Sequence, residues 1–247
     1  MQKINEILQT VEDNLSEKER QYFWTHSVRY SRIILQIERI AKGKKLTLLD
    51  IGCFPYHVGK ALELLGHTVY GISSYHEPIT SKRIVVLNIE NEKFPFKTNF
   101  FDIVLCNEVI EHLPQSPILM LREIYRVTKK GGILMVTTPN IARSINRGKL
   151  LIGKSIMYPP SVYFEEDGKG NTLYHRHNRE YTLKELQILF RKTDWHIDTE
   201  TYFISYTPFR KRLLPDSSLL VCGKYLNFLL MQLYPPLQDT LLILGKK

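Results

Sequence analysis

Residues 48–62 constrain the fold of this chain more than any other part of the sequence. They read LLDIGCFPYHVGKAL, an apolar run that leads into Asp50 and Gly52 and continues as a helical segment. A buried strand that ends near an acid and a glycine and then turns into a helix is typical of the ligand-binding edge of an open α/β sheet. The same turn has Phe54 and Tyr56 where such loops usually carry further glycines, and those residues resist positive φ and close backbone approach. The other loops of the chain are therefore needed to interpret this edge.

Short apolar runs alternate with helical segments through most of the chain. Strands are predicted at 46–51, 69–72, 84–87, 103–106, 133–136, 196–204 and 240–244. Strands that alternate with helices need crossover connections, which give a mainly parallel sheet. The sequence therefore predicts an α/β fold.

Three segments flank or interrupt this alternation. Apolar residues recur at helical spacing through residues 3–41, which predicts helices that cap the sheet. Residues 139–180 are rich in Gly, Pro, Tyr and charge, and they predict an insertion after the fifth strand. Thr182 and Glu185 form a capping-box pattern, so a helix is expected from there to about Lys192.

Composition limits the class of protein. A chain of 247 residues with 43% hydrophobic and 24% charged residues can bury one α/β domain. The three cysteines are few and widely spaced, which predicts free thiols, and the absence of a secretory signal pattern predicts a cytoplasmic protein. The net charge of +9 favours an anionic partner. No basic stripe is interleaved with aromatic residues, so a nucleic-acid partner is not expected.

Residues 217–234 are apolar, but Lys224 and Asn227 interrupt them and Pro235 ends them. They make a poor membrane-spanning helix. Two interpretations stay open: a helix packed on the sheet, or an interfacial helix that gives peripheral membrane contact through residues 210–234, beside the basic residues 210–212.

Ligands of such sheets bind at the carboxyl ends of the strands. Five predicted loops meet there, and each supplies polar or small residues. They contain Asp50, Gly52, Cys53, Phe54 and Pro55; Ser73 and Ser74; Asn88 and Ile89; Asn107, Glu108, Glu111 and His112; and Thr138, Pro139 and Asn140.

The segments LLDIGC (48–53), FPFKTNFFDIVLCNEVIEHLP (94–114) and EIYRVTKKGGILMVTTPN (123–140) resemble, in order and spacing, the class I S-adenosylmethionine-dependent methyltransferases. HNREYTLKELQILF (177–190) is similar to the segment that follows the insertion in many bacterial members. The resemblance implies a Rossmann-like, mostly parallel seven-stranded sheet with an antiparallel last strand, and S-adenosylmethionine as cofactor. We expect one domain, residues 1–247, in four parts. These are a helical cap at 1–41, the cofactor-binding half at 46–140, an insertion or acceptor lid at 141–180, and C-terminal helices with the last two strands at 181–247.

The resemblance also implies residue roles. Asp50 and the Gly52 backbone would hold the methionine end of the cofactor, and Asn107 would lie beside the sulfonium. The ribose would face Ser73 or Ser74, and the adenine would face Asn88 and Ile89. The remaining residues assigned to the cofactor are Cys53, Phe54, Pro55 and Glu108.

Methyl transfer to a hydroxyl needs a base within reach. His112 is the first candidate for this base, and His26 and His177 are the next. A metal site is not expected, because His175 and His177 lie two residues apart without a nearby cysteine or carboxylate pattern.

The acceptor is predicted from the 177–190 segment. It resembles methyltransferases that act on sugars or lipid-linked glycan intermediates of bacterial surface polysaccharide pathways, and Arg179 and Tyr181 would face such an anionic or sugar-like acceptor. A small metabolite is the alternative acceptor.

Departures from the family pattern support a different class of function. Phe54 and Tyr56 replace glycines, Ser73 stands where an acid usually grips the ribose, and Asn88 stands where aspartate is common. Either the loop takes another path, with Glu77 as the substitute acid, or the chain is a non-catalytic methyltransferase-like binding subunit. A nicotinamide dehydrogenase is a weaker alternative, because the G-x-G-x-x-G turn is absent.

Overall fold

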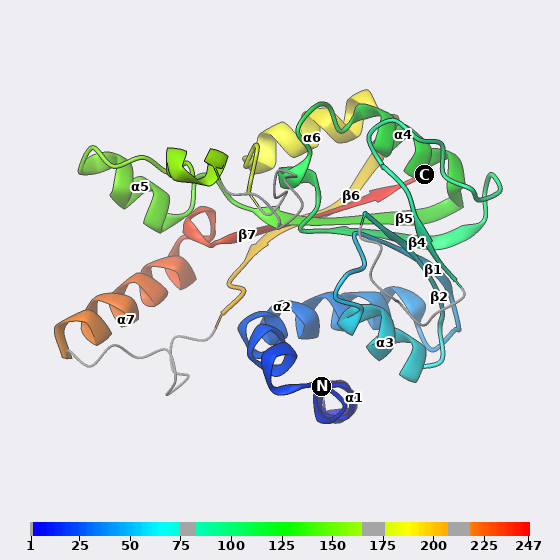
Figure 1. Ribbon diagram of the computed structural model, residues 1–247, viewed down its shortest axis with the longest axis horizontal. Coiled ribbons are helices and arrows are strands. Elements are labelled where there is room, and N and C mark those ends of the chain that lie inside the picture. Colours follow the sequence, from blue (N-terminus) through cyan, green and yellow to red (C-terminus); the bar gives the residue numbers. More distant parts are fainter. Residues whose placement is uncertain (1, 75–82, 165–175, 207–217) are drawn as a thin grey trace.

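The computed structural model describes residues 2–74, 83–164, 176–206 and 218–247, and its centre is a seven-stranded sheet (Figure 1). The strands are β1 (Thr47–Ile51), β2 (Thr68–Ser73), β3 (Ile84–Val86), β4 (Phe101–Asn107), β5 (Thr128–Pro139), β6 (His196–Phe203) and β7 (Thr240–Lys246). Their order is β3-β2-β1-β4-β5-β7-β6. The pairs among β1 to β5 are parallel, and β7 runs antiparallel to β5 and to β6. The predicted α/β fold and its antiparallel last strand are confirmed.

Helices cover both faces of the sheet. They are α1 (Gln2–Asp13), α2 (Glu17–Ala41), α3 (His57–Leu64), α4 (Ile118–Val127), α5 (Ser144–Leu151), α6 (Leu183–Lys192) and α7 (Ser218–Leu233). Figure 1 shows α4 and α6 on one side of the sheet and α1, α2 and α3 on the other. The predicted N-terminal cap is therefore two helices that pack on the second face.

The pattern of β4 explains why the sheet needs both layers. Val104 and Cys106 belong to the apolar cluster under α4 and α6, whereas Ile103 and Leu105 belong to the cluster under α1 to α3. Side chains of a strand alternate between its faces, so a strand that is apolar throughout must be buried on both sides. All of these residues are at most 1% exposed. The thiols of Cys53, Cys106 and Cys222 are free, as predicted.

Two local predictions have different outcomes. The capping box at Thr182 is confirmed, because its hydroxyl accepts the Glu185 N–H while the Glu185 carboxylate accepts the Thr182 N–H. The strand predicted at 133–136 is longer than expected, because β5 begins at Thr128 and includes Lys129 to Gly132. Helix α4 ends just before it, where the N–H and hydroxyl of Thr128 both donate to the Ile124 carbonyl.

The insertion and the apolar C-terminal helix lie at one end of the sheet. Figure 1 shows α5 and α7 extending to the left of the strands. Helix α7 exposes Leu226, Leu229, Leu230 and Leu233. Within the described ranges, no helix, α7 included, is both long enough and apolar enough to cross a bilayer. Residues 210–217, part of the predicted membrane contact, lie outside the described ranges.

Candidate cofactor and acceptor site

The end of β1 places Asp50 and Gly52 as the sequence predicts. Asp50 is 6% exposed, and burial raises the pKa of its carboxyl to about 7. Gly52 has φ +68°, and a Cβ there would lie 2.5 Å from a methyl carbon of Val109. The N–H groups of Gly52 and Cys53 both donate to the Ile72 carbonyl, at 2.9 and 3.1 Å. Glycine is therefore required at this turn, and the turn is held against β2.

The two aromatic residues of the turn, Phe54 and Tyr56, lie in different surroundings. The Tyr56 ring lies over α3, where a Cβ on Gly59 would come within 2.1 Å of it. The Tyr56 hydroxyl donates to Glu63 at 3.2 Å. Phe54 is 45% exposed, and Pro55 follows it through a cis peptide bond. Tyr56 thus packs against α3, through its ring and its hydroxyl.

The end of β4 supplies an amide. Both polar atoms of the Asn107 side chain are buried, and neither has a hydrogen-bond partner among the described residues. Buried amide groups in native proteins are nearly always paired, so an unpaired one requires an explanation. Asn107 directly follows the residues of β4 that pair with β1, which places it at the same sheet edge as Gly52. A polar ligand at this edge would satisfy the amide.

The N-terminal cap contributes charge to this edge through Arg29, which the sequence reasoning missed. Its guanidinium contacts the Glu108 carboxylate at 2.9 Å, and the other Glu108 oxygen accepts the Thr137 hydroxyl at 3.0 Å. Arg29 sits on a helix with ordinary amphipathic spacing, so no local pattern identifies it. Glu108 is consequently committed to an ion pair with the cap.

Aromatic rings and histidines gather between α2 and α3. The His26 ring lies 4.4 Å from Tyr22 and 6.2 Å from Tyr30, measured between centroids. Burial lowers the pKa of His26 to about 4, so this imidazole is neutral at pH 7. His57, which the sequence reasoning did not select, is buried 5.9 Å from Tyr30. The capping helix therefore places His26 in a half-buried aromatic cluster.

The predicted ribose and adenine residues are placed as follows. Ser73 is buried at the end of β2, whereas Ser74 is exposed. Glu77, the predicted substitute acid, lies outside the described residues. Asn88 is exposed, and its amide oxygen accepts the backbone N–H two residues later at 3.0 Å. Ile89 is partly buried and packs against the core. Asn88 therefore uses its amide oxygen within its own loop.

The acceptor side is built where the end of the insertion meets the loop after β4. Asn178 and Arg179 donate their backbone N–H groups to the Glu111 carbonyl, at 2.7 and 3.1 Å. The Asn178 side chain donates to the His112 carbonyl at 2.6 Å. Nδ1 of His112 lies 2.9 Å from the Arg176 carbonyl. These bonds fasten residues 176–180 to the short 3₁₀ helix Ile110–His112.

This junction brings together two of the predicted base candidates. The ring centroids of His112 and His177 lie 4.9 Å apart, with the rings nearly perpendicular. Glu111 is fully buried beneath them, and one of its oxygens accepts the Thr138 hydroxyl at 2.8 Å. Burial, followed by the nearby Glu108 charge, raises the pKa of the Glu111 carboxyl well above its ordinary range.

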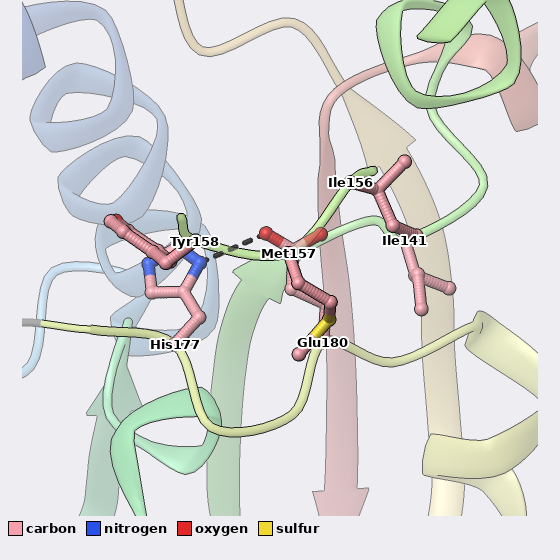
Figure 2. Close-up of a pocket in the computed structure, with 6 residues that line it drawn as sticks. All are labelled: Ile141, Ile156, Met157, Tyr158, His177 and Glu180. Atoms are coloured by element: carbon pink, nitrogen blue, oxygen red, sulfur yellow. Dashed lines mark hydrogen bonds and ion pairs between the residues drawn. The ribbon is translucent and has the colours of Figure 1, made fainter. Parts of the chain in front are cut away.

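His177 is held by a carboxylate. Figure 2 shows its Nδ1 hydrogen-bonded to Glu180, at 2.9 Å, beside a cavity of about 10 Å³ that is also lined by Met157 and Tyr158. That volume holds about one water molecule. Burial alone would raise the pKa of Glu180, but hydrogen bonds from His177 and Arg143 outweigh it and hold the pKa at about 2. Glu180 therefore remains ionised and orients the imidazole.

The two residues predicted to face the acceptor, Arg179 and Tyr181, lie in different environments. Tyr181 is 4% exposed and belongs to the apolar core above the sheet. Arg179 is exposed, pairs with Glu185 at 2.8 Å and lies over the Tyr181 ring. Arg179 is thus at the surface, whereas Tyr181 is a core residue whose ring is covered by the Arg179 guanidinium.

Part of this chain is similar in sequence to known methyltransferases. Residues 49–136 match the family model described as a methyltransferase domain. Ubiquinone biosynthesis O-methyltransferases of *Pseudomonas putida* and *Pseudomonas savastanoi* are 28% identical over 138 and 135 residues, half of this chain. The matched region spans 57% of the length of those enzymes.

Solved structures share the fold. A S-adenosylmethionine-dependent methyltransferase from *Archaeoglobus fulgidus* aligns with a TM-score of 0.58 at 14% identity, covering 92% of this chain and 99% of its own. The 1,6-didemethyltoxoflavin-N1-methyltransferase of *Burkholderia thailandensis*, solved with S-adenosylhomocysteine bound, aligns at 0.53 and 14% identity, covering 87% and 77%. Residues 49–136 are therefore similar to a methyltransferase domain, and the chain shares the fold of S-adenosylmethionine-dependent methyltransferases of known structure.

Proposed function

We propose that this chain transfers a methyl group from S-adenosylmethionine to a hydroxyl of a sugar or glycan-pathway intermediate. The observation that carries the proposal is that two buried polar side chains lie at one sheet edge: the carboxyl of Asp50 on β1, and the amide of Asn107 at the end of β4, which has no hydrogen-bond partner among the described residues. A ligand with an ammonium group and further polar atoms would satisfy both.

The residues at this edge fit the cofactor as follows. The Asp50 carboxylate would bind the ammonium of the methionine end, and the Gly52 backbone would lie against it without a side chain in the way. The Asn107 amide would bind a polar atom near the reacting centre. The cofactor supplies the transferable methyl group, and the protein contributes alignment and exclusion of water.

A hydroxyl acceptor is supported by two features. The 28%-identical relatives are named as O-methyltransferases. In this chain, the rings of His112 and His177 lie 4.9 Å apart at the junction of the insertion and the sheet edge, and a base within reach of the acceptor is what a hydroxyl acceptor requires. His26, which is half-buried and has its pKa lowered to about 4, is a weaker base.

The anionic or sugar-like character of the acceptor is supported by the surface near the insertion. Arg147 and Lys149 on α5 are exposed, as are Lys154 and Arg179. Arg143 differs from them, because Glu180 binds its guanidinium with two oxygens. A small metabolite with a hydroxyl is the alternative acceptor.

The rival from another class is a non-catalytic binding subunit that keeps the fold. Phe54 and Ser73 at the cofactor edge favour it, whereas Tyr56 gives it less support because its ring packs against Gly59 of α3. Methyl transfer from labelled S-adenosylmethionine to an acceptor extract separates the two functions.

Calorimetric titration with S-adenosylhomocysteine tests the cofactor site. We expect binding by the parent protein and a loss on the order of 10-fold or more in Asn107→Ala, because a buried polar contact contributes about 1–3 kcal/mol. Asn91→Ala, an exposed loop asparagine, is the matched control. Absence of binding by the folded parent protein at millimolar ligand would overturn the proposal.

We also propose that α7 contacts an anionic bilayer from one side. Its exposed leucines and the exposed basic residues of α5 lie at the same end of the molecule (Figure 1), a combination typical of interfacial helices. Sedimentation with anionic vesicles should decrease several-fold in Leu229→Glu/Leu233→Glu. Equal sedimentation of the parent and this variant would contradict the contact.

A further inference from the structure

Side chains from two distant segments of the sequence converge at the junction of the insertion and the sheet. Glu111, His112 and His177 each offer one ligand atom, and these atoms all lie within 4.8 Å of one another. Oε1 of Glu111 is fully buried and has no hydrogen-bond partner among the described residues. It lies 3.9 Å from Nε2 of His112. An unsatisfied buried carboxylate oxygen that faces imidazole nitrogens is a feature of a site that binds a cation.

Each of the three groups is oriented by a second partner. The Arg176 carbonyl lies 2.9 Å from Nδ1 of His112, and since a carbonyl only accepts, Nδ1 carries the proton and Nε2 keeps its lone pair. The Glu180 carboxylate acts in the same way on Nδ1 of His177, at 2.9 Å. The Thr138 hydroxyl holds the other oxygen of Glu111 at 2.8 Å. Metal-binding histidines almost always have such an outer partner on the second ring nitrogen.

We propose that Glu111, His112 and His177 bind a divalent first-row transition ion such as Zn²⁺. Two imidazoles and one carboxylate are a donor set for these ions, whereas Mg²⁺ and Ca²⁺ prefer oxygen ligands. Metal–ligand bonds of about 2.1 Å place the ligand atoms of a tetrahedral site about 3.4 Å apart. Each pair of ligand atoms therefore has to approach by at most about 1.4 Å when the ion binds, a movement within the range of side-chain rotations.

The spacing of residues in the sequence does not reveal this site, because it relates His177 only to its neighbours along the chain. Glu111 and His112 come from the loop after β4, and His177 returns from the insertion. The backbone bonds from Asn178 and Arg179 to the Glu111 carbonyl bring the two segments together. The expected absence of a metal rested on His175 and His177 alone, and His175 lies outside the described residues.

The site itself is independent of the reaction, but its role rests on the proposed function. Three protein ligands leave at least one open position on the ion, as in catalytic zinc sites. An oxygen of the acceptor would occupy that position, and the ion would lower the pKa of the bound hydroxyl. The acceptor class is then an alcohol or phenol that coordinates through its reacting oxygen, and His112 and His177 act as ligands instead of as free bases.

Equilibrium dialysis of the full chain against Zn²⁺, after chelator treatment, tests the site. We expect one ion per chain. His177→Ala should weaken binding by about 100-fold or more, and Glu180→Gln by about 10- to 100-fold, since outer partners contribute that much to affinity. His196→Ala, an exposed histidine on β6, is the matched control and should bind as the parent does. Thermal unfolding checks that each variant is folded. If His177→Ala does not fold, Glu180→Gln still tests the site.

The outcomes separate the metal site from the proposed function. Stoichiometric binding that is lost in His177→Ala and weakened in Glu180→Gln supports the site, whether or not S-adenosylhomocysteine binds. No stoichiometric Zn²⁺ binding by the parent protein, or equal binding by the parent and both variants, overturns it. S-adenosylhomocysteine binding by the chelator-treated protein in that case would leave the proposed function standing.

Discussion

Substitution of Asp50 by asparagine should change how stability depends on pH. Burial raises the pKa of this carboxyl from 3.8 to about 7 in the folded protein. Between those values the folded state holds a proton that the unfolded state has released, so stability falls as pH rises. About three pKa units correspond to a contribution on the order of 4 kcal/mol. It is fully present below pH 3.8 and lost above pH 7.

Urea unfolding at a series of pH values from 4 to 8 measures this contribution. The parent protein should lose more stability over that range than Asp50→Asn does, by up to about 4 kcal/mol. Asp50→Asn should therefore be relatively more stable at pH 8, although under the proposed function we expect it to bind S-adenosylhomocysteine more weakly. Asp198→Asn, on the exposed face of β6, is the control and should follow the parent. Parallel pH profiles for Asp50→Asn and the parent would refute the reasoning.

Three further substitutions test separate parts of the fold by urea unfolding. Gly52→Ala should lower the free energy of unfolding by about 2–4 kcal/mol, because Gly52 has positive φ and its new Cβ would overlap Val109. Gly148→Ala, where α5 has open space for a Cβ, should raise it by about 0.5–1 kcal/mol. Equal effects of the two substitutions would contradict the turn geometry. Arg29→Met should lower the free energy of unfolding by about 1–3 kcal/mol, because the partly buried Glu108 carboxylate then has no cation beside it. Arg122→Met, at an exposed arginine, is the control, and an equally large effect of that substitution would argue against this role of Arg29. Thr182→Ala should cost about 1 kcal/mol by removing the cap of α6, and an unchanged midpoint would refute the capping role.

The fold was predictable because its signals are local. Alternating apolar runs locate the strands, and the capping box at Thr182 marks a helix start within a few residues. The start of β5 was missed because basic residues followed by glycines usually end a helix. Here Thr128 ends α4 by donating twice to one carbonyl, so the strand begins before the glycines.

The residues of the candidate site were predictable only where they lie at or next to the end of a strand. Asp50, Gly52 and Asn107 lie at strand ends, so the sheet topology alone brings them to one edge. Arg29 could not be found in this way, because its role depends on how α2 crosses the sheet. The convergence of Glu111 with His177 also depends on the return path of the insertion, which no periodicity encodes.

The position of β7 affects the order in which the sheet can form. β7 lies between β5 and β6 in the sheet, although it follows both in the chain. During synthesis on the ribosome, His196–Phe203 emerges before the strand that pairs with it. Until then its backbone donors and acceptors form an unpaired edge, which other nascent chains can bind. Slower translation between β6 and β7 would lengthen this exposure, so the yield of native protein should depend on how quickly β7 is made.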